Sequence, residues 1–310
     1  MTRVRNCLPL VLGATCTLFS ISALANSLCQ AEMDRFNALP AEFDTAFINK
    51  ALSEIESSQS CSDSEKSLAR RATANRLFRL AYRGVKEGME ESEIDALLQQ
   101  SEAVAPTWRT LSYTATRDHD HGRYNAAARR FQSALALIDD RHETPKPPSV
   151  ETIAQLHQLA SEALLLADEY VPPPRVRGVV SGVLAERVRG FSVQRAPLPI
   201  RFETGKTDFT VQGELAAESL LQALKSQSQT LVKIVGHADE RGDSDFNYRL
   251  SLQRAQKVRD WLRQRGLERD IEVSGRGEQE PLVLNDPNRY SEQQRWQLNR
   301  RVELVRAGQS

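Results

Sequence analysis

Two side chains of opposite charge, Asp239 and Arg254, stand 15 positions apart (254 − 239) in the stretch GHADERGDSDFNYRLSLQRAQ, residues 236–256. The stretch follows an apolar run, LVKIV, that predicts a strand, and it continues into a segment with helical periodicity. A carboxylate can hold an ammonium group and a guanidinium can hold a carboxylate, so the pair predicts a site for a small zwitterion. The alternative is an internal salt bridge that ties the loop to the helix.

The elements around this pair place it at the edge of a sheet. Asp239 lies just beyond a predicted strand, where ligands bind in open sheets. Leu250 and Arg254 are four residues apart on the predicted helix and share a face. We expect both to look back toward Asp239, with Leu250 as an apolar wall for a methylene stem and with the adjacent Ala238 in the same site.

Three consecutive prolines, at 172–174, predict a hinge and lead-in over residues 172–197. Strands and helices alternate after it, which predicts one sheet with helices packed on it, α/β or α+β in class. The expected strands are residues 197–203, 230–236, 271–277 and 300–307, and the expected helices are 213–226, 247–266 and 291–299.

The region before the hinge, 26–171, predicts an α-helical domain. Its expected helices lie within 64–84, 92–106, 121–140 and 149–170. Small and aromatic residues over 122–134 resemble the second half of a tetratricopeptide repeat, and an irregular helical bundle is the alternative.

Residues 1–25 carry two arginines, an apolar run and a final Ala-Leu-Ala, the pattern of a cleaved secretory signal peptide. An uncleaved anchor is the alternative, and neither Cys16 nor Cys29 has a good lipobox. Cleavage would leave Cys29 and Cys61 in an oxidising compartment, where we expect a disulfide, although two unrelated buried thiols are the other possibility. No later stretch is apolar enough to span a bilayer.

Charge and composition exclude several classes of function. From residue 175 onward there are 23 Lys and Arg against 18 Asp and Glu, a net of +5, which is too weak to indicate nucleic-acid binding. The TGKT at 204–207 lacks the earlier glycine of a phosphate loop, and DHDH at 118–121 reads as a solvated turn between helices. No catalytic set, metal site or cofactor motif is evident, so we expect no enzyme activity.

The segments GHADERG, FN, LS, RA, GRGEQEP and NRRVEL occur in an order that resembles the OmpA-like C-terminal domain family, which includes the peptidoglycan-associated lipoproteins and MotB-like proteins. The resemblance covers about 198–306 and sets the expected domain at 198–308, with a mixed four-stranded sheet. It implies non-covalent binding of peptidoglycan through the diaminopimelate of the stem peptide. The family's paired acid and arginine fall on Asp239 and Arg254, its Asn on Asn247 and its apolar contact on Leu250.

One position departs from the family. Members usually carry Asn or Asp in the loop after the first strand, whereas FETGKTDF has Gly205 there.

The resemblance predicts a periplasmic protein of a Gram-negative bacterium that is held at the cell wall, with its outer membrane as a further place of association. The alternative function is a scaffold whose helical domain recruits an envelope partner, with wall binding only for localisation.

Overall fold

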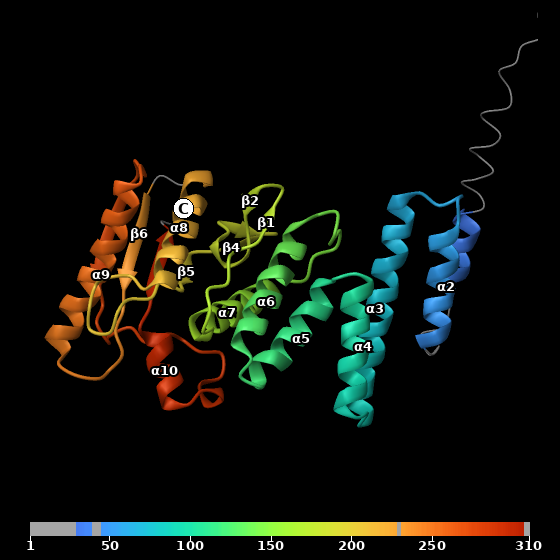
Figure 1. Cartoon of the computed structure of the whole chain (residues 1–310), viewed down its shortest axis with the longest axis horizontal. Coiled ribbons are helices and arrows are strands. Elements are labelled where there is room, and N and C mark those ends of the chain that lie inside the picture. The colour runs from blue at the N-terminus through green and yellow to red at the C-terminus, as the bar shows by residue number, and fades with distance from the viewer. Residues whose placement is uncertain (1–28, 39–44, 228–230, 307–310) are drawn as a thin grey trace, which may run out of the picture. The chain divides into compact units, whose positions relative to one another are not determined.

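The structure, a computed structural model, describes residues 29–38, 45–227 and 231–306 (Figure 1). The chain divides into two compact units, Met1–Pro106 and Thr107–Ser310. In the described part of the chain, no helix is both long and apolar enough to cross a membrane. The expected signal peptide, residues 1–25, lies outside the described residues.

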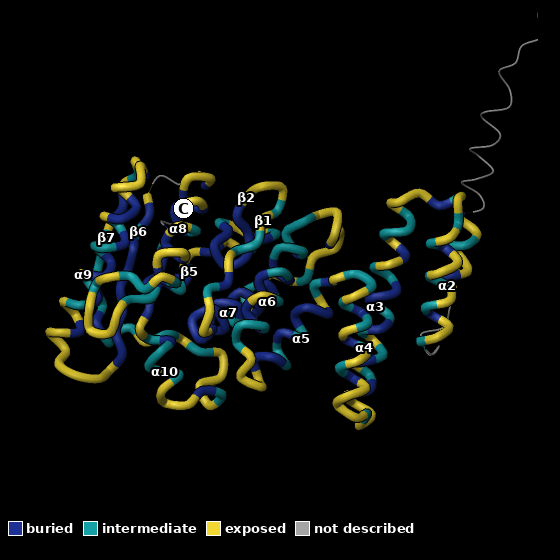
Figure 2. Tube along the Cα trace, in the orientation of Figure 1, coloured by how far each residue is buried: buried dark blue, intermediate teal, exposed yellow. Residues whose placement is uncertain are grey.

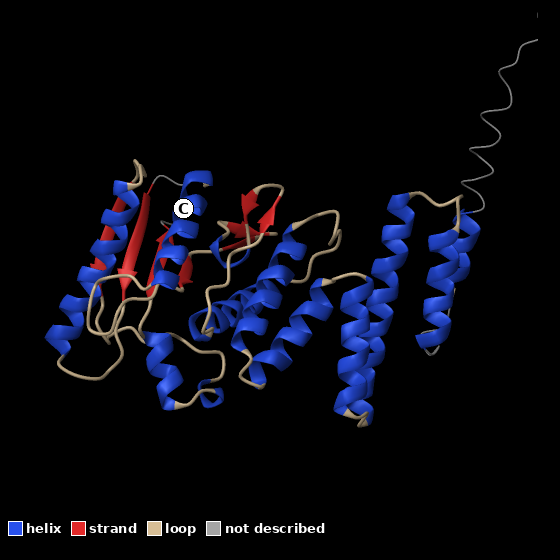
Figure 3. Ribbon diagram, viewed as in Figure 1, coloured by secondary structure: helices blue, strands red, loops and turns tan. Residues whose placement is uncertain are grey.

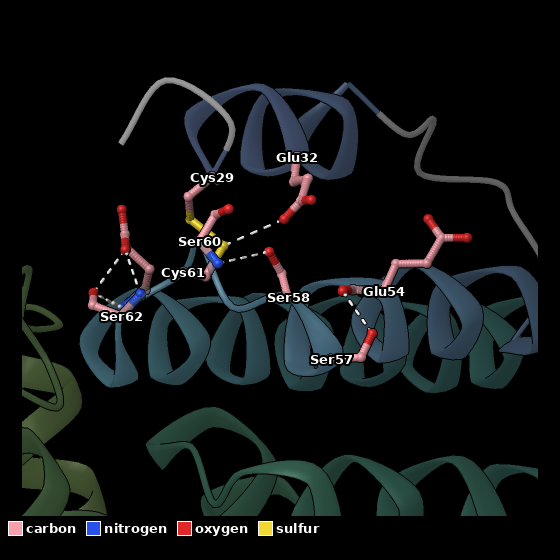
Figure 4. The surroundings of a disulfide bond; sticks show 9 residues. Cys29, Glu32, Glu54, Ser57, Ser58, Ser60, Cys61 and Ser62 are labelled. Carbon is pink, nitrogen blue, oxygen red and sulfur yellow. Dashed lines mark hydrogen bonds between the residues drawn. A yellow bond between two sulfur atoms is a disulfide. The ribbon is translucent and has the colours of Figure 1, made fainter. Parts of the chain in front are cut away.

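The first unit is helical, as predicted. Residues 29–37 form a helix, and three further helices follow. These are α2 (Thr45–Ser57), α3 (Asp63–Glu87) and α4 (Glu91–Val104). Phe36, Ile55 and Ala69 form a small core beside the two cysteines. The predicted Cys29–Cys61 disulfide is confirmed, with 5.0 Å between the Cα atoms, and it ties the first helix to the turn before α3 (Figure 4).

Helix α3 shows how local chemistry sets its ends. Ser62 and Glu65 form a capping box at its start, in which each side chain accepts a hydrogen bond from the other residue's backbone N–H. The sequence predicted that this helix ends at Gly84, but it continues to Glu87. Gly88 caps its end in a left-handed conformation with a φ of 78°. The Met89 side chain occupies the place that a Cβ on Gly84 would take, so glycine suits this position within the helix.

The second unit begins with three helices and continues into the sheet. Its helices and turns are α5 (Trp108–Asp120), α6 (Tyr124–Asp139), α7 (Val150–Leu166), η1 (Gly182–Leu184), α8 (Val211–Ser226), α9 (Ser244–Gln264), η2 (Pro287–Arg289) and α10 (Glu292–Asn299). Its strands are β1 (Arg175–Val176), β2 (Val179–Val180), β3 (Arg187–Val188), β4 (Phe191–Ser192), β5 (Arg195–Leu198), β6 (Leu231–Gly236), β7 (Asp270–Gly275) and β8 (Val302–Arg306).

The predicted hinge at 172–197 is not the division between the units, which falls after Pro106. Within it, β1 pairs with β2 and β3 pairs with β4 in two small antiparallel hairpins. Each hairpin turns at an Arg-Gly pair with positive φ, Arg177-Gly178 and Arg189-Gly190. Val180 of β2 and Val188 of β3 enter one core with helices α6 and α7 and the sheet. The predicted limits 26–171 and 198–308 thus separate residues that share a hydrophobic core.

The predicted mixed four-stranded sheet is confirmed, with strand order β5-β8-β6-β7 (Figure 3). Strand β8 is antiparallel to β5 and β6, whereas β6 and β7 are parallel. A parallel pair needs a crossover, and α9 supplies it. Most residues of β8 are buried. The same is true of β6, whose trace is largely dark blue in Figure 2.

Two paired glycines allow α9 to lie directly on the sheet. Gly236 of β6 and Gly275 of β7 are opposite each other in the register. A Cβ on Gly236 would stand 2.0 Å from the carbonyl oxygen of Ser251, and one on Gly275 would stand 2.7 Å from the backbone nitrogen of Leu252. This close approach fixes the part of α9 that carries Arg254.

A buried polar cluster connects α5 and α7 to Tyr290, near the end of the sheet domain. The Tyr290 hydroxyl donates to Glu162 of α7 at 2.5 Å and lies 2.9 Å from His119 Nε2 of α5. The hydroxyl has one proton, so His119 Nε2–H donates to it. Burial lowers the pKa of His119 to about 4, which keeps the ring neutral.

The same cluster corrects the expectation that DHDH is a solvated turn. His119 and Asp118 are buried in the last turn of α5. Asp118 is tolerated there because Arg123 and Arg130 donate to its carboxylate at 2.8 and 2.6 Å.

Reduction of the Cys29–Cys61 disulfide is expected to destabilise the first unit selectively. Closing a loop of this length stabilises a fold by about 3 to 4 kcal/mol in the chain-entropy description. All three tryptophans of the chain lie in the second unit, so their fluorescence reports that unit alone. Reductant should lower the melting temperature of a helical transition seen by circular dichroism. It should leave the melting temperature seen by tryptophan fluorescence unchanged. Identical dichroism melts for the reduced and oxidised protein would contradict this, and the Cys29→Ser/Cys61→Ser variant controls for the reductant.

Tyr290→Phe is expected to destabilise the second unit by about 1 to 3 kcal/mol, because it leaves the buried Glu162 carboxylate without its hydroxyl donor. Denaturant unfolding followed by tryptophan fluorescence measures this loss. Tyr248→Phe, at an exposed position on α9, is the matched control and should change stability little. Equal midpoints for the two variants would show that the Tyr290 hydroxyl contributes nothing.

Stability of the second unit is expected to fall as the pH falls from 7 to 4. Burial lowers the pKa values of His119 and His157 to about 4, whereas an unfolded histidine titrates near 6.5. Below pH 6.5 the unfolded chain binds protons that the folded chain rejects, which removes up to about 1.4 kcal/mol per pH unit for each ring. Denaturation at pH 7, 6 and 5 should show a smaller slope for His157→Gln than for the control His142→Gln, which replaces an exposed histidine. Equal slopes would contradict the prediction.

Candidate functional site

The loop that follows β6 is held by hydrogen bonds to its neighbours. The backbone N–H of Ala238 donates to the carbonyl of Gly277 at 2.8 Å. The side-chain amide of Asn247 lies 3.1 Å from the Asp239 carbonyl, 3.0 Å from the Arg241 carbonyl and 2.9 Å from the Glu278 carboxylate. Asp243 caps α9 by accepting from Phe246 N–H. The loop is therefore a fixed platform for Asp239.

Asp239 is buried and already has four donors. Its Oδ1 accepts from the backbone N–H and Nε of Arg241 at 3.1 and 2.9 Å. Its Oδ2 accepts from Arg241 Nη2 at 2.9 Å and Arg300 Nη1 at 2.7 Å. Burial alone would raise the pKa of Asp239, but the hydrogen bonds from Arg241 and Arg300 outweigh it and lower the pKa to about 2. The carboxylate is charged at any physiological pH.

Arg254 is 8% exposed and has no described carboxylate as an ion-pair partner. Its Nε donates to the Lys206 carbonyl at 3.1 Å, and its guanidinium carbon lies 5.0 Å from the centre of the Phe202 ring. Burial lowers the pKa of Arg254 and nearby Arg300 lowers it further, while Asp239 raises it. An arginine stays charged under such conditions. The site therefore holds a buried cation that could bind an anionic ligand.

This cation lines a cavity of about 500 Å³, which is within the range of small-molecule sites. Arg201, Arg241 and Arg300 line it as well, and Leu165, Leu198, Ile200 and Phe202 give it an apolar wall. Asp168 is the one acidic residue among its described lining residues. The arrangement suits a ligand with a carboxylate and a short apolar stem.

The structure brings Asp239 and Arg254 to one region without pairing them, so the internal salt bridge between them is not formed. Asn247 and Ala238 are buried in the loop scaffold, and Leu250 is half-buried and does not line the cavity. The apolar wall comes instead from residues before α8 and from the end of α7.

Several cavity residues were not assigned from the sequence. Arg300 belongs to the NRRVEL segment and Arg241 to GHADERG, so both stood within recognised motifs. Asp168 and Arg201 gave no such signal, because only the packing of α7 on the sheet domain brings them together. Among the described residues, no three His, Cys, Asp or Glu side chains are placed to hold a metal ion.

Comparison with known proteins gives the same picture for the C-terminal part. Residues 201–295 match the OmpA family. The chain is 30% identical over 128 residues to a peptidoglycan-associated lipoprotein of Pseudomonas putida, an alignment that covers 41% of this chain and 71% of that protein. Among solved structures, the peptidoglycan-associated lipoprotein from Burkholderia pseudomallei is 30% identical, with 35% of this chain and 88% of that chain covered and a TM-score of 0.30.

The alignment with another relative covers only a small part of that relative's length. The photosystem I P700 chlorophyll a apoprotein A2 of Gloeobacter violaceus is 28% identical over 133 residues, which are 42% of this chain and 15% of that protein. The similarity to each relative thus extends over less than half of this chain. The motifs of this chain, its mixed sheet and its match to most of the Pseudomonas putida protein all indicate the same family. The chain belongs to the OmpA family through its C-terminal domain.

Proposed function

We propose that this protein binds peptidoglycan non-covalently, through the free amino-acid end of diaminopimelate in the stem peptide, and so holds itself to the cell wall. The observation that carries the proposal is Arg254, a buried guanidinium at a cavity of about 500 Å³ that makes no hydrogen bond or ion pair with a carboxylate of the described residues. A ligand carboxylate would supply the missing charge and accept two parallel N–H bonds. The names of two relatives as peptidoglycan-associated lipoproteins support peptidoglycan as the polymer that is bound.

Asp239 serves the same site in this proposal by holding Arg241 and Arg300 at the cavity. Direct contact between Asp239 and a ligand ammonium requires one of these arginines to leave, and both have substantially exposed side chains that allow such a movement. Asn247 and Ala238 keep the loop in place, so their part in binding is indirect. The interaction is an equilibrium and involves no turnover.

The location that this function implies is the periplasm of a Gram-negative bacterium, at the cell wall beneath the outer membrane. Recruitment of an envelope partner by the first unit is a second proposal. It is supported by exposed apolar side chains on α3, Leu68 and Val85 among them. The two functions are compatible, because wall binding is assigned to the second unit.

Arg254→Ala is expected to weaken binding to diaminopimelate-containing sacculi by about 10- to 100-fold, since a hydrogen-bonded charge contributes about 1.5 to 3 kcal/mol. Sedimentation of the purified protein with sacculi, over a range of sacculus concentrations, measures the change. Arg249→Ala removes an exposed arginine from the same helix and is the matched control. Arg254→Lys keeps the charge but not the two-pronged geometry, and should lie between wild type and Arg254→Ala.

Tryptophan fluorescence unfolding of each variant separates a binding defect from misfolding. Asp239→Ala should also reduce binding, because Arg241 and Arg300 lose their common acceptor. If folded Arg254→Ala sediments with sacculi as wild type does, the assignment of the cavity is wrong.

A further inference from the structure

The cavity at Arg254 has one wall that does not come from the family domain. Asp168 lies two residues beyond the end of α7, outside the matched residues 201–295, yet it lines the same cavity as Arg254 and Gly205. Leu165, in the last turn of α7, lines it too. The helical segment therefore contributes directly to the candidate site.

A zwitterionic ligand needs an acceptor for its ammonium group as well as a donor for its carboxylate. Asp239 is poorly suited while the observed contacts persist, because two donors already occupy each of its oxygens. A carboxylate offers about four lone-pair sites in all. An ammonium at Asp239 would have to displace an arginine from a close ion pair.

The loop after β5 offers no acid to the cavity either. Its lining residues Thr204 and Gly205 carry no charge, and Gly205 has a φ of 68° with open space around its Cα. Space therefore exists on this side of the cavity, and the loop leaves a negative charge to be supplied from elsewhere.

Asp168 meets the requirement. It is exposed to solvent, and its carboxylate has no hydrogen bond or ion pair with any described residue. Its backbone is nevertheless held, because Arg201 donates to the main-chain carbonyls of Ala167 and Asp168. Arg201 itself lines the cavity, so the contact that ends α7 also fixes Asp168 at the cavity rim.

We propose that Asp168 accepts the ammonium group of the amino-acid end whose carboxylate Arg254 binds. The proposal rests on the function proposed above and assigns the ammonium subsite to a residue outside the family domain. In this arrangement the carboxylate lies against Arg254 in the buried part of the cavity and the ammonium lies nearer to solvent. The apolar stem between the two ends of diaminopimelate then runs along the wall that includes Leu165.

The test compares native sacculi with sacculi whose free amines have been acetylated, which removes the ammonium charge and keeps the carboxylate. The full chain is used, and binding is measured by sedimentation. Wild type should bind native sacculi about tenfold more tightly than acetylated sacculi, as expected for loss of one charge-assisted contact. Asp168→Asn should bind native sacculi about tenfold less tightly than wild type and should no longer distinguish the two preparations.

Glu169→Gln is the matched control, because it removes the same charge from the next residue, which does not line the cavity. Asp168→Asn retains the main-chain carbonyl that Arg201 contacts, so the end of α7 should stay folded. If Asp168→Asn binds like wild type and still prefers native sacculi, the ammonium subsite lies elsewhere, while a loss of binding in Arg254→Ala would still support the proposed function. If wild type does not bind sacculi at all, the proposed function fails, and this subsite fails with it.

Discussion

A buried guanidinium without a carboxylate partner is the constraint that organises the second unit. Removing a charge from water is costly, so hydrogen bonds or an ion of opposite charge must offset the burial of such a group. Here the Lys206 carbonyl and the face of Phe202 hold Arg254, and the glycine pair in β6 and β7 fixes the helix that carries it. Arg254 lines the cavity.

The arginines around this cavity are held apart by different acceptors. Arg241 and Arg300 share Asp239, whereas Arg201 donates to main-chain carbonyls at the end of α7. Four like charges would otherwise repel one another across a small volume. Because one carboxylate compensates two of them, and main-chain carbonyls together with the charge of Asp168 compensate Arg201, we infer that the remaining attraction for an anion is strongest near Arg254.

The sequence was sufficient to predict the order and type of the sheet elements, because Val, Ile and Leu runs and helical periodicity are local signals. The boundary between the two structural units could not be predicted from such local signals. Three prolines at 172–174 suggested a hinge, but Val180 and Val188 of the two hairpins after them belong to a core shared with α7 and the sheet. Such sharing depends on contacts between residues distant in sequence, as does the burial of His119 by Tyr290, 171 positions away (290 − 119).

The site followed the same pattern. Asp239 and Arg254 could be identified because the spacing of apolar residues along the sequence predicts where strands end and which residues share a helix face. Both residues also lie in the family motifs. Their partners could not be identified, since Arg300 reaches Asp239 across 61 positions (300 − 239) and donates to the carboxylate that we expected to face Arg254. Geometry of this kind is decided by side-chain packing that no local pattern encodes. The tetratricopeptide-like half-repeat at 122–134 stays a prediction.

The attachment of α7 gives the helical segment a part in the site that a simple tether would not have. Glu162 fixes the last part of α7 to Tyr290, and Arg201 donates to the carbonyl of Ala167 just beyond its end. Between these two points lies Leu165, which lines the cavity and packs beside Tyr290 and Leu298. A displacement of α7 would therefore move one wall of the cavity and the acid at its rim, while Arg254 stays on α9. The affinity of the site then depends on how the helices pack as well as on the residues that the family motif contains.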